Sequence, residues 1–211
     1  MQVRSFGLTL ALAVLPAFSL DAQVGKSVGV REANTATVAE MSTLPGLTPA
    51  LAQEIAAGRP FLSATAFDAF LAPKLSTEQR AALYPRLFVH VDLNTATREE
   101  ILLVPGIGPR MLREFLEYRP YRAMAQFRRE MGKYVSPEEV ARFEQYVFVP
   151  MDLNTASDED LLTIPGFGPR MLREFREYRP YRAIEQFRRE IGKYVDKTEL
   201  ARLETFVAIK P

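Results

Sequence analysis

The chain has 211 residues, of which 47% are hydrophobic and 25% charged, a composition that is typical of a globular protein and argues against disorder. It has no cysteine, which excludes a disulfide framework, a thiolate metal site and a cysteine nucleophile. Its 27 basic and 26 acidic residues give a net charge of +1, which argues against binding nucleic acid through bulk positive charge. Any anion site must therefore be local.

Residues 1–22 have the pattern of a secretory signal peptide. Arg4 precedes an apolar run over 6–15, and Pro16 and a stretch of small residues follow it. The run is too short to span a bilayer comfortably. We expect cleavage after Ser19 or Ala22 and a periplasmic or secreted mature protein. The alternatives are a membrane anchor formed by an uncleaved leader, or a buried first helix.

A four-residue pattern of Asn, Thr, Ala and Thr or Ser recurs at intervals of 60 residues after this leader. It begins at Asn34, Asn94 and Asn154. Pro-Gly pairs and further prolines keep the same spacing, which predicts three tandem units over 31–90, 91–150 and 151–211. The second and third units are near-copies, whereas the first has drifted.

The first predicted helix of the second unit begins near Thr97. The segment Thr-Arg-Glu-Glu over 97–100 is a capping box, in which the hydroxyl and the glutamate satisfy free amides at the helix start. The helix must stop by Val104, because Pro105 disfavours helical geometry in the residue before it. Gly106 and Gly108 then permit a tight turn.

Three more helices complete the unit. Pro109 is favourable in the first turn of a second helix, which Pro120 ends. A third helix is expected from about 123 to 131, and a fourth from 137 to about 147 behind the capping box at 136–139. Apolar Met111, Leu112 and Phe115 share one face of the second helix, while the charged residues, among them Glu114, fall on the other. The fold class is therefore all-α, with about four short helices per unit and strand signals confined to the joints between units.

The sequence around the first turn resembles a known family. Residues 104–110 read Val-Pro-Gly-Ile-Gly-Pro-Arg and residues 164–170 read Ile-Pro-Gly-Phe-Gly-Pro-Arg, which look like the hairpin of the helix-hairpin-helix family. The preceding Leu-Asn-Thr-Ala segments are similar, more narrowly, to the ComEA-type competence DNA-receptor domain of periplasmic or surface proteins that capture DNA. The resemblance covers 91–149 and 151–207 well and 31–89 weakly.

The physical chemistry of the turn agrees with that family's function. A glycine-rich turn that leads into a helix presents free amides, and the helix dipole adds partial positive charge. We expect one phosphate on the amides of Gly106, Ile107 and Gly108 beside Arg110. We expect a second phosphate at the equivalent residues of the third unit, which are Gly166, Phe167, Gly168 and Arg170.

Local charge supports these two sites. The segment 110–133 carries seven basic and three acidic residues, and 170–193 carries eight and four, so each has a net charge of +4. Arg113 and Arg173 are further candidate phosphate contacts, and Lys133 and Lys193 in the second hairpin of each unit are secondary ones. That second hairpin lacks the Gly-x-Gly form, and a turn that only completes the core is the alternative interpretation.

The first unit departs from the pattern. Its hairpin reads Leu-Pro-Gly-Leu-Thr-Pro-Ala over 44–50, so Thr48 replaces the second glycine and Ala50 replaces the basic residue. We expect this unit to bind no phosphate and to serve as a cap or a partner surface.

The resulting hypothesis is an exported protein, not an enzyme, that binds double-stranded DNA through its phosphate backbone without sequence preference, as a receptor in competence and DNA uptake. It implies no catalytic residue, no metal, no cofactor and no small-molecule substrate; the only histidine, His90, lies in a joint between units. The alternative is a structural or protein-interaction scaffold of the cell envelope or a secretion system, because the same turn also joins two short helices well. Envelope uptake or secretion machinery is the expected protein partner under either reading.

Overall fold

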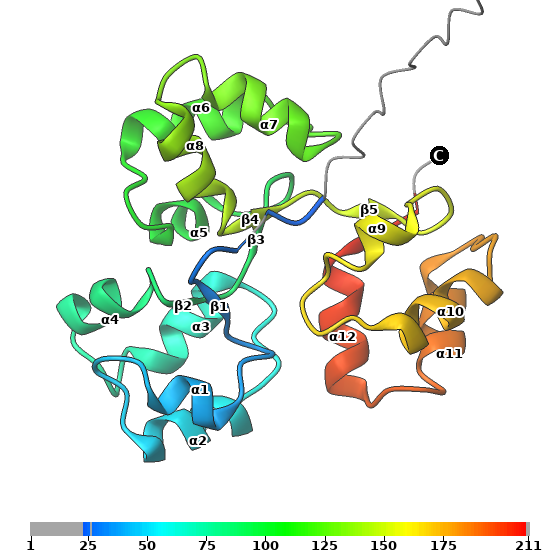
Figure 1. Ribbon diagram of the computed structural model, residues 1–211, viewed down its shortest axis with the longest axis horizontal. Coiled ribbons are helices and arrows are strands. Elements are labelled where there is room, and N and C mark those ends of the chain that lie inside the picture. The colour runs from blue at the N-terminus through cyan, green and yellow to red at the C-terminus, as the bar shows by residue number, and fades with distance from the viewer. Residues whose placement is uncertain (1–22, 26, 210–211) are drawn as a thin grey trace, which may run out of the picture.

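The computed structural model describes residues 23–25 and 27–209, so the predicted signal peptide lies outside the described residues. The described chain is mostly helical, with six strands of two residues each, in agreement with the predicted α class (Figure 1). Among these residues, no helix has both the length and the apolar character needed to cross a membrane.

One order of elements occurs three times along the chain. For description we call 31–90, 91–150 and 151–209 units 1, 2 and 3. Unit 1 contains β1 (Arg31–Glu32), α1 (Val38–Ser42), α2 (Pro49–Ala57), α3 (Ala64–Leu71), α4 (Thr77–Leu83) and β2 (Leu87–Phe88). Unit 2 contains β3 (Val91–Asp92), α5 (Arg98–Leu103), α6 (Pro109–Glu117), α7 (Met124–Met131), α8 (Pro137–Glu144) and β4 (Val147–Phe148). Unit 3 contains β5 (Met151–Asp152), α9 (Asp158–Leu161), α10 (Pro169–Glu177), α11 (Ile184–Ile191), α12 (Lys197–Thr205) and β6 (Val207–Ala208).

Capping residues set the helix starts where the sequence predicts them. The hydroxyl of Thr97 accepts from the amide of Glu100, and the Glu100 side chain accepts from the amide of Thr97. The hydroxyl of Ser136 likewise caps α8 by accepting from the amide of Glu139. The fourth helix ends at Glu144 rather than near Val147, because Val147 belongs to the strand β4.

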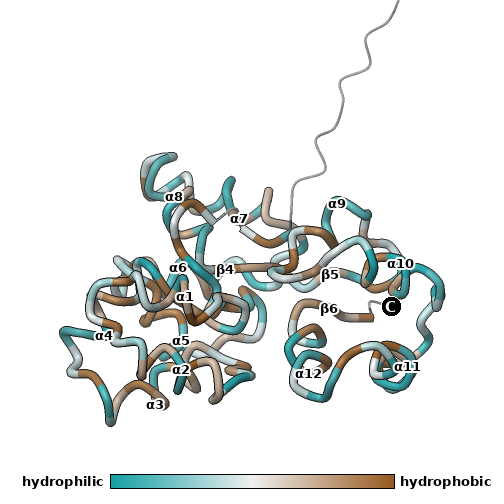
Figure 2. Tube along the Cα trace, turned by 60° about the horizontal axis from the view of Figure 1, so that its bottom comes forward, coloured by the Kyte–Doolittle hydropathy of each residue, from teal (hydrophilic) through white to brown (hydrophobic). Residues whose placement is uncertain are grey.

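Each unit is closed by a short parallel strand pair. The registers are Arg31↔Leu87, Val91↔Val147 and Met151↔Val207. Each pair brings the first residues of a unit beside its last ones, which the sequence suggested only as extended joints. The strands β4 and β6 are hydrophobic along their length (Figure 2).

Units 1 and 2 share one hydrophobic core, and unit 3 has a core of its own. In Figure 1 the first unit (blue to cyan) and the second (green) accordingly lie side by side, with the third (yellow to red) on the other side of the view. Val24, which precedes unit 1, and Phe148 of unit 2 both pack into the core of unit 3. Val24 also forms an antiparallel bridge with Phe148, so the N-terminal described residues tie the units together.

The buried face of α6 is the predicted one, with one exception. Met111, Leu112 and Phe115 are buried as the helical spacing indicates. Glu114, which we expected on the solvent face, is buried, and so is Glu174 in α10. Each of these carboxylates lies within 3.5 Å of the arginine before it. Tyr134 and Tyr194 of the second hairpin lie within hydrogen-bonding reach of Glu114 and Glu174, so the second hairpin packs over this side of the helix.

Candidate nucleic-acid interface

The predicted phosphate sites lie at the turns that lead into α6 and α10. Gly106 and Gly166 have positive φ values of +82° and +74°, which a residue with a Cβ rarely adopts. Gly108 and Gly168 are in extended geometry and occupy the N-cap position, where neither supplies a side-chain hydrogen bond. Both helices therefore begin without a capping side chain.

Uncapped starts leave free amides in the first turn of these helices. Within the described part of the chain, the amides of Gly108, Arg110 and Met111 donate no hydrogen bond, while Leu112 donates the first helical one to Gly108. A Cβ built on Gly108 meets nothing within 4 Å, and the same is true of Gly168. An anion can therefore reach these amides from solvent.

The amide of Ile107 is not part of this set, contrary to our expectation. It donates to Val104 O at 3.1 Å and closes the turn, and the amide of Phe167 donates to Ile164 O at 3.0 Å. Both side chains are buried, so the turn is anchored to the core. The amides of Ile107 and Phe167 therefore drop out of the site, whereas the amides of Gly106 and Gly166, like those of Gly108 and Gly168, donate no hydrogen bond to a described residue.

Unit 1 shows the same turn in a closed form. Gly46 has a φ of +87°, as in the other units, but Thr48 at the N-cap accepts from the amide of Leu51 at 3.1 Å. The threonine hydroxyl thus accepts a hydrogen bond from an amide whose equivalents in units 2 and 3 stay free. Because Ala50 also replaces the arginine, unit 1 lacks both features of the site.

The arginines at the two open helix starts differ in their availability. Arg110 and Arg170 are exposed, and neither forms an ion pair or hydrogen bond through its side chain with a described residue. Arg113 and Arg173 are also exposed, but each lies 3.4–3.5 Å from the glutamate that follows it. Arg110 and Arg170 are therefore the cations best placed to meet an anion beside the free amides.

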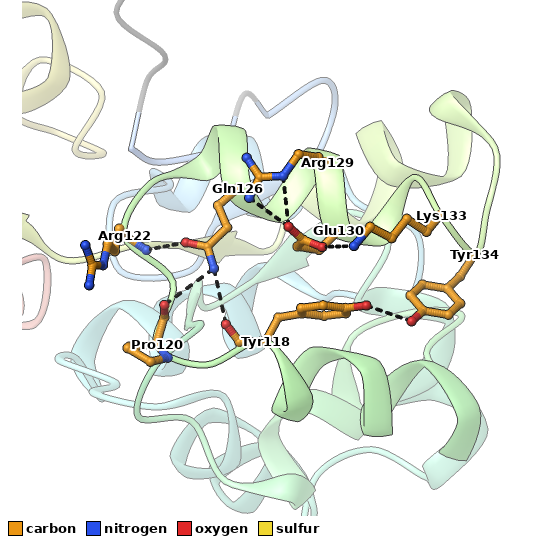
Figure 3. Close-up of polar contacts among 8 residues, drawn as sticks. All are labelled: Tyr118, Pro120, Arg122, Gln126, Arg129, Glu130, Lys133 and Tyr134. Atoms are coloured by element: carbon orange, nitrogen blue, oxygen red, sulfur yellow. Dashed lines mark hydrogen bonds and ion pairs between the residues drawn. The ribbon is translucent and has the colours of Figure 1, made fainter.

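Lys133 and Lys193 already have partners. Lys133 forms an ion pair with Glu130, and the Lys133 ammonium lies 4.9 Å from the centre of the Tyr118 ring (Figure 3). Glu130 also pairs with Arg129 at 2.7 Å. The hydrogen bond from Lys133, followed by that from Arg129, lowers the pKa of Glu130. Lys193 has the equivalent ion pair and ring contact in unit 3. The structure does not bring these lysines to the free amides as unpaired charges.

The connector between α6 and α7 is fixed by side-chain hydrogen bonds. Gln126 accepts from the amide of Arg122 at 2.9 Å and donates to the carbonyl of Tyr118 at 3.3 Å (Figure 3). The hydroxyls of Tyr118 and Tyr134 are 2.8 Å apart, which links α6 to the second hairpin. Both hairpins of unit 2 therefore belong to one packed body.

The repeated asparagine and a later arginine have structural roles that the sequence did not reveal. The Asn94 side chain accepts from the amide of Tyr121 at 2.6 Å and donates to its carbonyl at 2.9 Å. Arg119 donates to the carbonyls of Leu93 and Ala96, so its charge is held inside the unit. The recurrence of both residues at 60-residue spacing was the available signal. Arg119 therefore contributes to the local net charge, but its guanidinium is not available at the surface to contact an anion.

The opposite flank of each turn is covered. The guanidinium of Arg142 in α8 donates to Pro105 O at 2.8 Å, and a Cβ on Gly106 would lie 2.3 Å from it. Gly166 faces Thr35 of unit 1 and Arg202 of α12 instead. The Cα side of Gly106 and Gly166 is thus used for packing, whereas a Cβ on Gly108 or Gly168 meets nothing within 4 Å.

Comparison with protein-family models, curated proteins and solved structures found no match to this chain. The function is therefore argued from the geometry of the residues.

Among the described residues, no cluster of three or more acidic or histidine side chains is arranged to hold a metal ion. His90 is buried in the joint between units 1 and 2, and neither of its ring nitrogens has a hydrogen-bond partner there. Burial, assisted by the charge of Arg202, lowers the pKa of His90 to about 4. The imidazole is therefore neutral at physiological pH.

Proposed function

We propose that the chain binds double-stranded DNA through its phosphate backbone without reading sequence, and that it acts outside the cytoplasm as a receptor in DNA uptake. In this proposal the three units are tandem helix-hairpin-helix repeats of the ComEA type, of which the first is degenerate. The protein is not an enzyme and needs no cofactor. Units 2 and 3 form the binding pair.

The observation that carries the proposal is the pair of uncapped helix starts, each with an exposed and unpaired arginine beside it. Free amides at a helix N-terminus bind phosphate oxygens, and the helix dipole strengthens the interaction. Because Ile107 and Phe167 anchor the turns to the core, the amides are held in place before an anion arrives.

Contacts of this kind recognise backbone and not bases. Non-specific binding of duplex DNA has dissociation constants of roughly 10⁻⁴ to 10⁻⁶ M at physiological salt, and affinity falls steeply as salt rises. Two hairpins on one chain add avidity where both reach the same duplex. We therefore expect affinity at the tighter end of that range and no preference among random sequences.

Charge reversal at the two open sites tests the proposal. We expect the chain to shift random duplex DNA in a gel at low salt, and Arg110→Glu with Arg170→Glu to abolish the shift. The matched control is Arg86→Glu with Arg98→Glu, which makes the same change in net charge at two other exposed arginines and should retain most of the shift. An intact shift in the Arg110 and Arg170 variant would refute the proposal, as would the absence of any shift for the unaltered chain.

A scaffold of the cell envelope or a secretion system is the second candidate. It is favoured by the covered flank of each turn, because Gly106 and Gly166 are used for packing against Arg142 and Thr35. A scaffold predicts no salt-dependent shift of duplex DNA, so the same gel distinguishes the two functions.

A further inference from the structure

All three units contribute to one small cavity that is partly open to solvent. It has a volume of about 230 Å³, and its charged or titratable lining residues come from different parts of the chain. They are Glu32 of β1, His90 of the joint, Asp92 of β3, Glu100 of α5 and Arg202 of α12. At roughly 30 Å³ per water molecule, the cavity has room for about seven waters, which is also the size of a small amino acid.

Two buried side chains in the cavity have nitrogen atoms without a hydrogen-bond partner among the described residues. Arg202 is 3% exposed; its Nε and Nη2 bind Glu199 at 2.8 and 2.7 Å, but its Nη1 has no hydrogen-bond partner among the described residues. His90 is 8% exposed, and both of its nitrogens are unbonded there. Because buried polar groups in folded proteins are nearly always hydrogen-bonded, these atoms indicate space for a bound acceptor.

The carboxyl groups of the same cavity lack a cation in contact. The Glu32 oxygens accept from the amide and the side chain of Asn34, and no described cation lies within ion-pair distance of them. Burial raises the pKa of Glu32 to about 7, against the attraction of Arg202, and burial also raises the pKa of Asp92. A positively charged group in the cavity would therefore be favourable beside these carboxylates.

We propose that this cavity binds a small zwitterion of amino-acid size, with its carboxylate on Arg202 Nη1 and the His90 ring and its ammonium group on Glu32 and Asp92. A simple anion would meet the carboxyl groups of Glu32, Asp92 and Glu100, and a simple cation would meet Arg202. Only a molecule with both charges satisfies both sides. The molecule would be a ligand and not a reactant, and the inference goes beyond the proposed DNA binding and does not rest on it.

Such a ligand would link unit 3 to the other two units. Arg202 belongs to unit 3, whereas the carboxyl groups belong to units 1 and 2. A molecule that binds only where all three units meet stabilises the assembled chain by mass action. We therefore expect ligand binding to raise the midpoint of thermal unfolding.

Isothermal titration calorimetry of the full chain tests the inference with defined probes. Glycine, alanine and serine are the zwitterions; acetate, methylammonium and inorganic phosphate are the single-charge probes. We expect at least one zwitterion to bind at least tenfold more tightly than every single-charge probe. Equal or tighter binding of acetate, methylammonium or phosphate would overturn the inference, as would no binding of any zwitterion at millimolar concentration.

The chain supplies a matched control for the arginine. Arg142 occupies in unit 2 the place that Arg202 has in unit 3 and pairs with Glu139 as Arg202 pairs with Glu199, but it does not line the cavity. Arg202→Met should weaken zwitterion binding at least tenfold, while Arg142→Met should leave it unchanged.

A second variant keeps the test decisive if circular dichroism shows that Arg202→Met does not fold. His90→Phe removes the ring nitrogens and retains Arg202, so it should weaken binding of the zwitterion several-fold. Wild-type affinity in a folded Arg202→Met variant, or in His90→Phe where only that variant folds, would refute the site. The gel shift of duplex DNA is expected to be the same in the unaltered chain and in His90→Phe, so failure of this inference is distinguishable from failure of DNA binding.

Discussion

The proposed DNA contact can be blocked by giving units 2 and 3 the N-cap residue of unit 1. In unit 1 the Thr48 hydroxyl accepts a hydrogen bond from the amide of Leu51, three residues later in the first turn of α2. Gly108→Thr with Gly168→Thr places the same hydroxyl at the same N-cap position. The substitution is compatible with the fold, because both glycines are in extended geometry and an added Cβ meets nothing within 4 Å. It should therefore remove an anion contact without disturbing the helix.

The expected magnitudes differ for stability and binding. Threonine and glycine are similar N-cap residues, so the free energy of unfolding should change by only a few tenths of a kcal/mol. A hydrogen bond to a charged phosphate contributes about 1.5–3 kcal/mol, which corresponds to roughly a 10- to 100-fold change in affinity for each hairpin lost. The added Cβ also holds a phosphate away from the backbone.

Duplex affinity from fluorescence anisotropy, compared with the midpoint of urea unfolding, checks this prediction. The control uses another copy from unit 1: Ala123→Ser with Ala183→Ser introduces the cap that Ser63 provides for α3. It should stabilise the chain by about 1 kcal/mol per cap and leave DNA affinity unchanged. Unaltered affinity in the double threonine variant would show that the amides of these two helix starts do not hold phosphate.

Three further predictions concern the framework around the site. Asn94→Ala removes both hydrogen bonds to Tyr121, so urea titration should show a loss of about 1–3 kcal/mol in the free energy of unfolding; a neutral result would contradict the clamp role. Gly25→Ala places a Cβ 1.6 Å from Glu144 O and should displace residues 23–25, so the amide of Val149, which donates to Gln23 O, should exchange hydrogen faster; unchanged exchange would refute this. Burial raises the pKa of Glu32 from 4.5 to about 7, so the folded chain holds this proton longer than the unfolded chain, and stability from this group falls as pH rises between those values. The free energy of unfolding of Glu32→Gln, measured by urea titration, should therefore rise relative to that of wild type by on the order of 3 kcal/mol between pH 4.5 and 7. The opposing contribution of His90 is common to both chains, and a difference that does not depend on pH would contradict the pKa shift of Glu32.

Local signals in the sequence were sufficient for the helices and the turn. Thr97, Ser136 and the Pro-Gly-x-Gly-Pro segment act on residues within four positions, so their effect does not depend on the rest of the fold. The apolar face of α6 was predictable for the same reason. The buried Glu114 was not, because the second hairpin that covers it follows about 20 residues later.

Contacts between distant segments explain what the sequence did not predict. Arg142 and Arg202 occupy equivalent positions, pair with equivalent glutamates and lie beside their own unit's turn, but only Arg202 also lines the cavity that contains His90 and Glu32. The difference arises from the packing of unit 3 against residues more than 100 positions earlier. No pattern within one 60-residue unit encodes that neighbourhood.

Comparison among the units separates the shape of the turn from its proposed use. Unit 1 keeps the left-handed Gly46 and the helix-joining turn while Thr48 caps α2, so the fold does not require an uncapped helix at this position. Units 2 and 3, which are near-copies and count as one instance, leave the amides free and add an exposed arginine two residues after the second glycine. A turn that only joins helices has no need of either change. An anion needs both, because the amides bind its oxygens and the guanidinium balances its charge, and this is the physical reason to prefer phosphate binding over a purely structural role for units 2 and 3.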